Sequence, residues 1–146
     1  MNKVKSLLIS GKESLPLFEG GKGISISTGE SSGAWAKAGG VGTFSGVNAD
    51  SFDEHGNLVQ QKYKGSTRFL RHQELVKYSV DGAVHQAKVA RDIAGGQAAL
   101  HVNILWEMAA AETILTETLE KAGDIIDGVT CGAGMPYKLS EIAAKY

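Results

Sequence analysis

Short apolar runs with glycines before or after them recur along the chain, and each has the length of a β-strand. Four such runs are predicted to be strands: 16–19, 41–47, 98–106 and 124–131. In the third run, Leu100, Val102 and Ile104 alternate with His101 and Asn103. Alternation of this kind predicts one strand face under helices and an opposite face that is polar.

Between these runs the apolar positions follow a helical period. Ser27 and Glu30 have the form of a capping box, and Gly39-Gly40 closes the first predicted helix. Its expected packing face consists of Ser31, Ala34, Trp35 and Ala38. The second predicted helix, 72–94, has its packing face at Val76, Val80, Ala83, Ala87, Ala90 and Ala94. The third, 108–122, has its packing face at Met108, Ala111, Leu115, Thr118, Leu119 and Ala122. The fourth, 136–146, has its packing face at Leu139, Ile142, Ala143 and Tyr146.

Two segments stand apart from this alternation. Residues 48–71 are polar and contain a Gly56-Asn57 turn signal, so they form either a small hairpin or a long functional loop. Residues 1–15 are expected to be a leader into the first strand, with Val4, Leu7 and Leu8 holding it against the body of the fold.

Strands that alternate with helices predict an α/β fold with a parallel sheet. Four strand–helix units are half of an eight-stranded barrel, for which about 250 residues is typical, and the last helical pattern continues to Tyr146 without a stop signal. We therefore expect residues 1–146 to be the N-terminal half of a (β/α)8 TIM barrel. Its second and third strands are separated by an insertion at about 48–71.

Composition narrows the function classes. The 15 basic and 16 acidic residues are dispersed, which argues against a nucleic-acid partner or an anionic membrane surface. No apolar run has the length of a signal sequence or a membrane span, and a single cysteine fits a reducing compartment. The four histidines lack metal-ligand spacing. We expect a cytoplasmic protein that acts on a small-molecule substrate without a metal, with homo-oligomerisation left open.

Ligands of parallel α/β barrels bind at the carboxyl ends of the strands. Position alone therefore selects four candidate segments: 19–22, 43–46, 103–106 and 130–134. An amide such as Asn103, at the end of an otherwise aliphatic strand, suits a ligand contact, although a hydrogen-bonded polar group inside the barrel would have the same pattern.

The segments EGGKG (19–23), AWAKAGGVGTFSG (34–46), HVNILW (101–106) and VTCGAGMP (129–136) resemble motifs of the nitronate monooxygenase family, FMN enzymes on a TIM barrel. The resemblance implies that FMN contacts Gly20, Gly21, Lys22, Asn103, Thr130, Cys131, Gly132 and Ala133. Lys22 replaces a methionine common in the family, and either binds an anionic group of flavin or substrate or points to solvent. Cys131 could be a nucleophile, but no histidine adjoins it in sequence, so it is expected to line the flavin cavity by shape.

The resemblance also places the FMN phosphate loops and the catalytic base beyond Tyr146, so catalytic residues are unknown here and residues 1–146 alone are expected to be inactive. The implied activity is oxidation of alkyl nitronates with molecular oxygen. Two alternatives remain open: an NAD(P)H-dependent flavin enoyl reductase of the same superfamily, and a non-catalytic α/β module that pairs with a second copy or a partner to complete a barrel.

Overall fold

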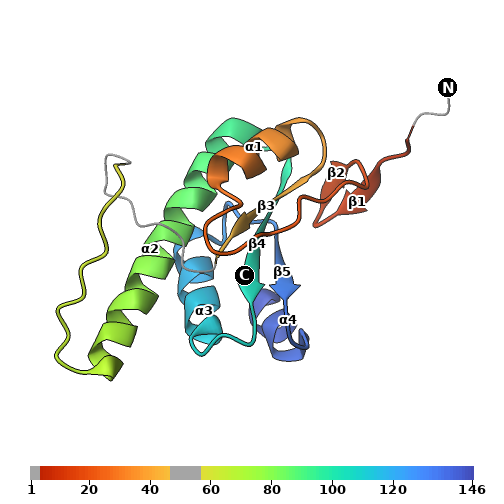
Figure 1. The fold of residues 1–146 in the computed structure, drawn as a ribbon. Coiled ribbons are helices and arrows are strands. Elements are labelled where there is room, and N and C mark those ends of the chain that lie inside the picture. The colour runs from red at the N-terminus through yellow and green to blue at the C-terminus, as the bar shows by residue number, and fades with distance from the viewer. Residues whose placement is uncertain (1–3, 47–56) are drawn as a thin grey trace.

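The computed structural model describes residues 4–46 and 57–146 (Figure 1). Its strands and helices alternate after a short N-terminal hairpin. In chain order the elements are β1 (Leu7–Ile9), β2 (Lys12–Ser14), α1 (Gly29–Lys37), β3 (Val41–Ser45), α2 (Arg68–Ala94), β4 (Ala99–Leu105), α3 (Ala111–Ala122), β5 (Gly128–Gly132) and α4 (Tyr137–Ala143).

The main sheet of the described residues is parallel, with strand order β3-β4-β5. The predicted strand at 16–19 is reduced to a parallel bridge between Phe18 and Val41. Its backbone nevertheless continues the ladder, because Glu19 N–H donates to Val41 O at 2.9 Å and Val41 N–H donates to Leu17 O at 2.8 Å. All four predicted strand positions therefore lie side by side, in chain order and in one direction.

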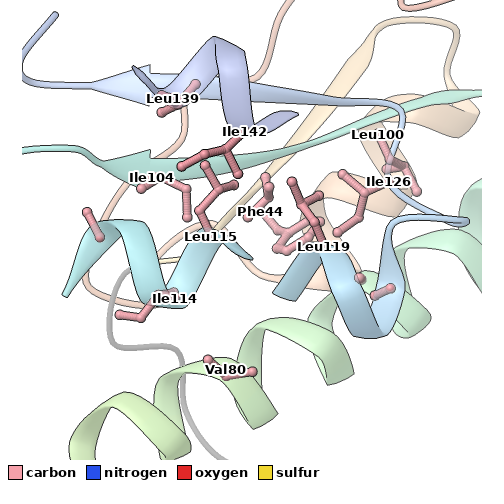
Figure 2. Packing of buried hydrophobic residues seen from close by; sticks show 14 of the residues in the cluster. Phe44, Val80, Leu100, Ile104, Ile114, Leu115, Leu119, Ile126, Leu139 and Ile142 are labelled. Atoms are coloured by element: carbon pink, nitrogen blue, oxygen red, sulfur yellow. The ribbon is translucent and has the colours of Figure 1, made fainter. Parts of the chain in front are cut away.

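The hydrophobic core lies on one face of this sheet. Phe44 of β3 and Leu100, Val102 and Ile104 of β4 are fully or almost fully buried there. Residues of all four helices belong to the same cluster, and Figure 2 shows Leu115 of α3 and Ile142 of α4 beside the strand residues, with Val80 on α2. The alternation predicted for β4 and the helical face predicted for α2 are confirmed.

Helix α1 differs from its prediction in both its cap and its buried face. The capping box is formed by Thr28 and Ser31, one residue later than the predicted pair. The buried positions are Gly29, Ser32, Gly33 and Ala36, whereas the predicted packing positions are exposed. A Cβ on Gly33 would lie 2.7 Å from Ala90 O of α2. Helix α1 therefore turns its glycines toward α2, a choice that hydrophobicity could not indicate because both faces consist mainly of small residues.

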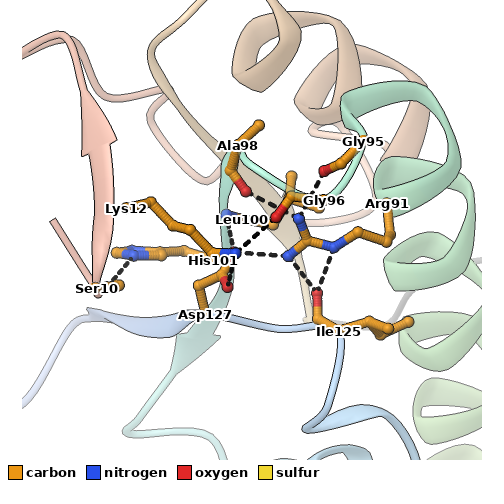
Figure 3. Close-up of polar contacts among 10 residues, drawn as sticks. All are labelled: Ser10, Lys12, Arg91, Gly95, Gly96, Ala98, Leu100, His101, Ile125 and Asp127. Carbon is orange, nitrogen blue, oxygen red and sulfur yellow. Dashed lines mark hydrogen bonds and ion pairs between the residues drawn. The ribbon is translucent and has the colours of Figure 1, made fainter.

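The prediction that residues 1–15 form a leader held against the body of the fold by apolar side chains is wrong. Strands β1 and β2 form an antiparallel hairpin, and Val4, Leu7 and Leu8 are exposed instead of packed against the body. The hairpin is attached through polar contacts at the amino ends of the main strands (Figure 3). Lys12 Nζ donates to Gly96 O at 2.6 Å and lies 3.8 Å from Asp127, just before β5.

The insertion lies partly outside the described residues, since 47–56 carry no description. Its last residues belong to α2, which begins at Arg68 and not at the predicted residue 72 because Thr67 caps it. Residues 57–67 contain no named helix or strand. They lie along the first half of α2, where Glu74 accepts hydrogen bonds from the backbone of Lys64 and Gly65. The hairpin alternative is therefore not seen in the described part of this segment.

The C-terminal elements are shorter than predicted. Strand β5 starts at Gly128 instead of the predicted residue 124, and the carboxylate of the preceding Asp127 accepts from Leu100 N–H. Helix α4 ends at Ala143 instead of continuing to residue 146. The architecture shown is thus an α/β fold with a parallel sheet and helices on one face. No helix within the described residues is long and apolar enough to cross a membrane.

Candidate functional site

The face of the sheet opposite the helices carries polar side chains, and we call it the polar face. Register places Thr43 beside His101, and places Asn103 between Ser45 and Thr130. Because side chains alternate along strands, these five residues share a face while their neighbours enter the hydrophobic core. The carboxyl ends of all three strands meet at the edge formed by Ser45, Asn103 and Thr130.

Asn103 is the centre of this edge. Its side chain is 9% exposed, and among the described residues its amide makes no hydrogen bond. Gly21 packs directly against it, since any Cβ at that position would collide with the Asn103 side chain. On its other side, a Cβ on Gly132 would lie 3.3 Å from Oδ1 and 3.5 Å from Nδ2. Three sequence-predicted segments therefore converge on one amide.

The loop that contains Gly20, Gly21 and Lys22 is held by Ser27. The Ser27 hydroxyl donates to Gly20 O at 3.1 Å and accepts from Lys22 N–H at 3.0 Å, and the side chain is buried. Ser27 O in turn accepts from Ser45 N–H of β3. Sequence analysis assigned Ser27 to a helix cap and missed this role. The Lys22 side chain is exposed and makes no ion pair within the described residues.

Glu19 fixes the same loop to the sheet. Its buried carboxylate accepts from Thr43 N–H at 3.1 Å and from the Ser31 hydroxyl at 2.9 Å. With both oxygens occupied by structural donors, this carboxylate serves to position the start of the glycine loop.

The last residues of β5 have side chains on both faces of the sheet. Thr130 lies beside Asn103 and donates to Val102 O at 3.4 Å. Cys131 pairs with Ile104, packs against the hydrophobic core and contacts the carbonyl oxygens of Ala133 and Gly134. The Cys131 side chain therefore lies on the core face of β5, and its expected place in a flavin cavity stays a prediction. Ala133 and Gly134 have positive φ values of 53° and 85°, which turn the chain sharply beyond the edge.

His101 lies deeper on the polar face, toward the amino end of β4. It is 7% exposed, and its Nε2 lies 2.8 Å from Ser10 Oγ. Its ring contacts the Phe18 ring edge-on, with 6.1 Å between the two ring centroids. Burial lowers the pKa of the imidazole, and the nearby charge of Asp127 opposes that shift in part. Within the described residues, His101 Nδ1 and Thr43 Oγ1 are buried without a hydrogen-bond partner.

This arrangement suits binding and orientation. The edge offers an amide that can both donate and accept, and Gly21 and Gly132 leave the space in which it lies. The described residues contain no group of three or more His, Cys, Asp or Glu side chains able to hold a metal ion. The groups that this edge offers are hydrogen-bond donors and acceptors.

No protein-family model matches the chain, and no curated protein matches it. Functional conclusions consequently depend on the residues and geometry described above.

Proposed function

We propose that the carboxyl edge of the sheet binds FMN, and that the protein is a flavin-dependent oxidoreductase resembling nitronate monooxygenase, on half of a parallel (β/α)8 barrel. The observation that supports this most strongly is the convergence of Gly21 and Gly132 on Asn103. Segments far apart in sequence, selected by their resemblance to flavin-binding motifs, meet at one edge of the sheet.

The residues present fit such a group. Among the described residues the Asn103 amide makes no hydrogen bond, and a cofactor with donors and acceptors on its ring system would supply partners for both of its polar atoms. The glycines at positions 21 and 132 leave the space that the Asn103 side chain occupies, so the amide is held between two backbone segments. Ser27 and Glu19 hold the glycine loop in place before any ligand arrives, so little ordering is required on binding.

Bound FMN would supply the redox chemistry, taking electrons from an alkyl nitronate and passing them to molecular oxygen. The chain's own residues bind and orient. Asn103 would hydrogen-bond a polar group of the ring system, the backbone at Gly132 and Ala133 would contact it, and the exposed Lys22 would supply a positive charge nearby. We assign no catalytic acid or base among the described residues of this edge.

Asn103→Leu tests the proposal. Leucine nearly keeps the volume of asparagine but removes both hydrogen-bonding functions. We expect FMN affinity, measured by titration of flavin fluorescence, to fall about five- to hundred-fold, which corresponds to roughly 1–3 kcal/mol for an unpaired buried partner.

Asn57→Leu, at an exposed position in the insertion, is the matched control and should leave FMN affinity unchanged. Melting of each variant without flavin separates binding from folding. A normal FMN dissociation constant for Asn103→Leu, together with an altered melting temperature, would make Asn103 a structural residue and contradict the proposal.

A further inference from the structure

A buried glutamine on α2 makes a hydrogen bond away from the ligand edge. Gln86 is 8% exposed, and its side-chain oxygen Oε1 accepts from Gly29 N–H in the first turn of α1. The first N–H groups of a helix have no acceptor within the helix, so this donor would be buried and unpaired without Gln86. Helix α1 lies against the second half of α2 (Figure 1), and a Cβ on Gly29 would collide with the backbone oxygen of Gln86. The bond therefore fixes the start of α1 on α2.

The start of α1 leads directly to the support of the glycine loop, residues 20–23. Ser27 stands two residues before Gly29. Its hydroxyl donates to Gly20 O and accepts from Lys22 N–H. Two residues span at most about 7 Å of chain. Ser27 therefore cannot move far while Gly29 stays bonded to α2.

The glycine loop has few side chains with which to hold itself in place. Three of its four residues are glycines, and the Lys22 side chain makes no ion pair within the described residues. Glycine also gives a loop more conformational freedom than any other residue. The place of Gly21 against Asn103 therefore depends on bonds that reach the loop from outside it. Ser27 supplies the two that flank Gly21.

We propose that Gln86 is a positioning residue of the ligand edge: through Gly29 and Ser27 it holds Gly21 against Asn103 without touching the ligand. The inference rests on the proposed function for the identity of the ligand, whereas the contacts are made by the chain alone. A change on α2 that leaves every residue of the ligand edge in place should therefore weaken ligand binding.

Gln86→Met tests this chain of contacts. Methionine nearly keeps the length of glutamine but offers only a weak acceptor. If the loop then keeps its place for only about a tenth to a fifth of the time, FMN affinity falls about five- to tenfold. Gln86→Glu keeps an oxygen acceptor beside the first turn of α1, where a negative charge is favourable, and should restore most of the affinity. Fluorescence titration of the full chain with FMN measures these values.

Val80→Ala is the matched control for lost stability. Val80 is fully buried on α2, so its truncation destabilises the fold without removing a contact to the glycine loop. This variant should keep the wild-type FMN affinity at a temperature at which every variant is folded. Equal affinity of the wild-type and Gln86→Met chains, or an equal fall in Gln86→Met and Val80→Ala, would overturn the proposal.

Hydrogen exchange follows the loop without flavin. The Lys22 amide is bonded to Ser27, and in Gln86→Met it should exchange faster, relative to the amides of β4, than it does in Val80→Ala. If Gln86→Met fails to fold, the wild-type chain provides the test, because the amides of Gly29 and Lys22 should open together. A Lys22 amide that exchanges while Gly29 stays protected would overturn the proposal.

The two measurements separate this inference from the flavin site. A loop that loosens in Gln86→Met, in a chain that does not bind FMN, would leave the positioning role intact and count against the flavin site. A chain that binds FMN and keeps the same loop protection in Gln86→Met would do the reverse.

Discussion

The buried histidine on the polar face links protonation to stability. His101 is held as a neutral ring by burial, so its pKa in the folded chain lies below the ordinary value of 6.5. The unfolded chain then binds the proton more readily than the folded chain. Stability from this residue is fully present above about pH 6.5, and it falls as pH drops from there toward the folded pKa.

We predict that the free energy of unfolding decreases from pH 7.5 to pH 5, and that His101→Gln flattens this dependence. Urea unfolding at a series of pH values measures both. His72→Gln, at an exposed position of α2, is the control and should keep the wild-type slope. An identical slope in the His101 and His72 variants would show that another group dominates the acid response.

At the scale of elements, the contact between α1 and α2 depends on close approach of two helix backbones. Gly33 lies against the backbone of Ala90 and the side chain of Ile93, with 2.7 Å and 2.8 Å available to a new Cβ. Both distances are shorter than real Cβ atoms tolerate. Glycine costs helix propensity at this position, and the cost is offset by the packing it permits.

We predict that Gly33→Ala destabilises the fold by about 1–3 kcal/mol, although alanine is the better helix former. Gly96→Ala is the matched variant, because nothing lies within 4 Å of a Cβ at that site. Its unfolding free energy should stay level or rise slightly as the unfolded chain loses freedom. Chemical denaturation of both variants measures these changes in unfolding free energy. A Gly33→Ala variant more stable than wild type would mean that α1 and α2 can move apart without loss of stability.

At the scale of the whole molecule, one ionic cluster joins the helix layer to the sheet and the hairpin (Figure 3). Arg91 of α2 donates to Ile125 O, Gly95 O and Ala98 O, and pairs with Asp127 at 2.6 Å. Both charged side chains are 15% exposed. Asp127 also accepts from Leu100 N–H and attracts Lys12 of the hairpin.

Removing Arg91 leaves the largely buried Asp127 carboxylate with only the Leu100 N–H and the more distant Lys12 ammonium. We predict that Arg91→Ala lowers the free energy of unfolding by roughly 3–5 kcal/mol, and that Arg91→Lys recovers only part because lysine lacks the planar fork. Lys77→Ala breaks an exposed pair with Asp81 and should cost less than about 1 kcal/mol. Equal losses for Arg91→Ala and Lys77→Ala in denaturant titrations would remove this cluster from the forces that join the layers.

Local pattern alone determined much of this protein. Glycines beside the apolar runs indicate where the strands lie along the chain. The alternation from Leu100 to Ile104 separates core side chains from Asn103 and His101. The helical face of α2 follows from its period in the same way. These features are predictable because burial of a strand or helix face depends on residues two to four positions apart.

Only the tertiary structure decided which distant groups meet. Arg91 and Asp127 are 36 positions apart, and Ser27 became the support of the glycine loop only once the chain had turned back on itself. The buried face of α1 also needed α2 in place, because both of its faces carry small residues and the energetic difference arises from how closely the two backbones approach. The spacing of apolar residues indicates which face of a segment is buried. The hydrogen-bond partner of a polar atom depends on how separate segments pack together, and no local pattern specifies that partner.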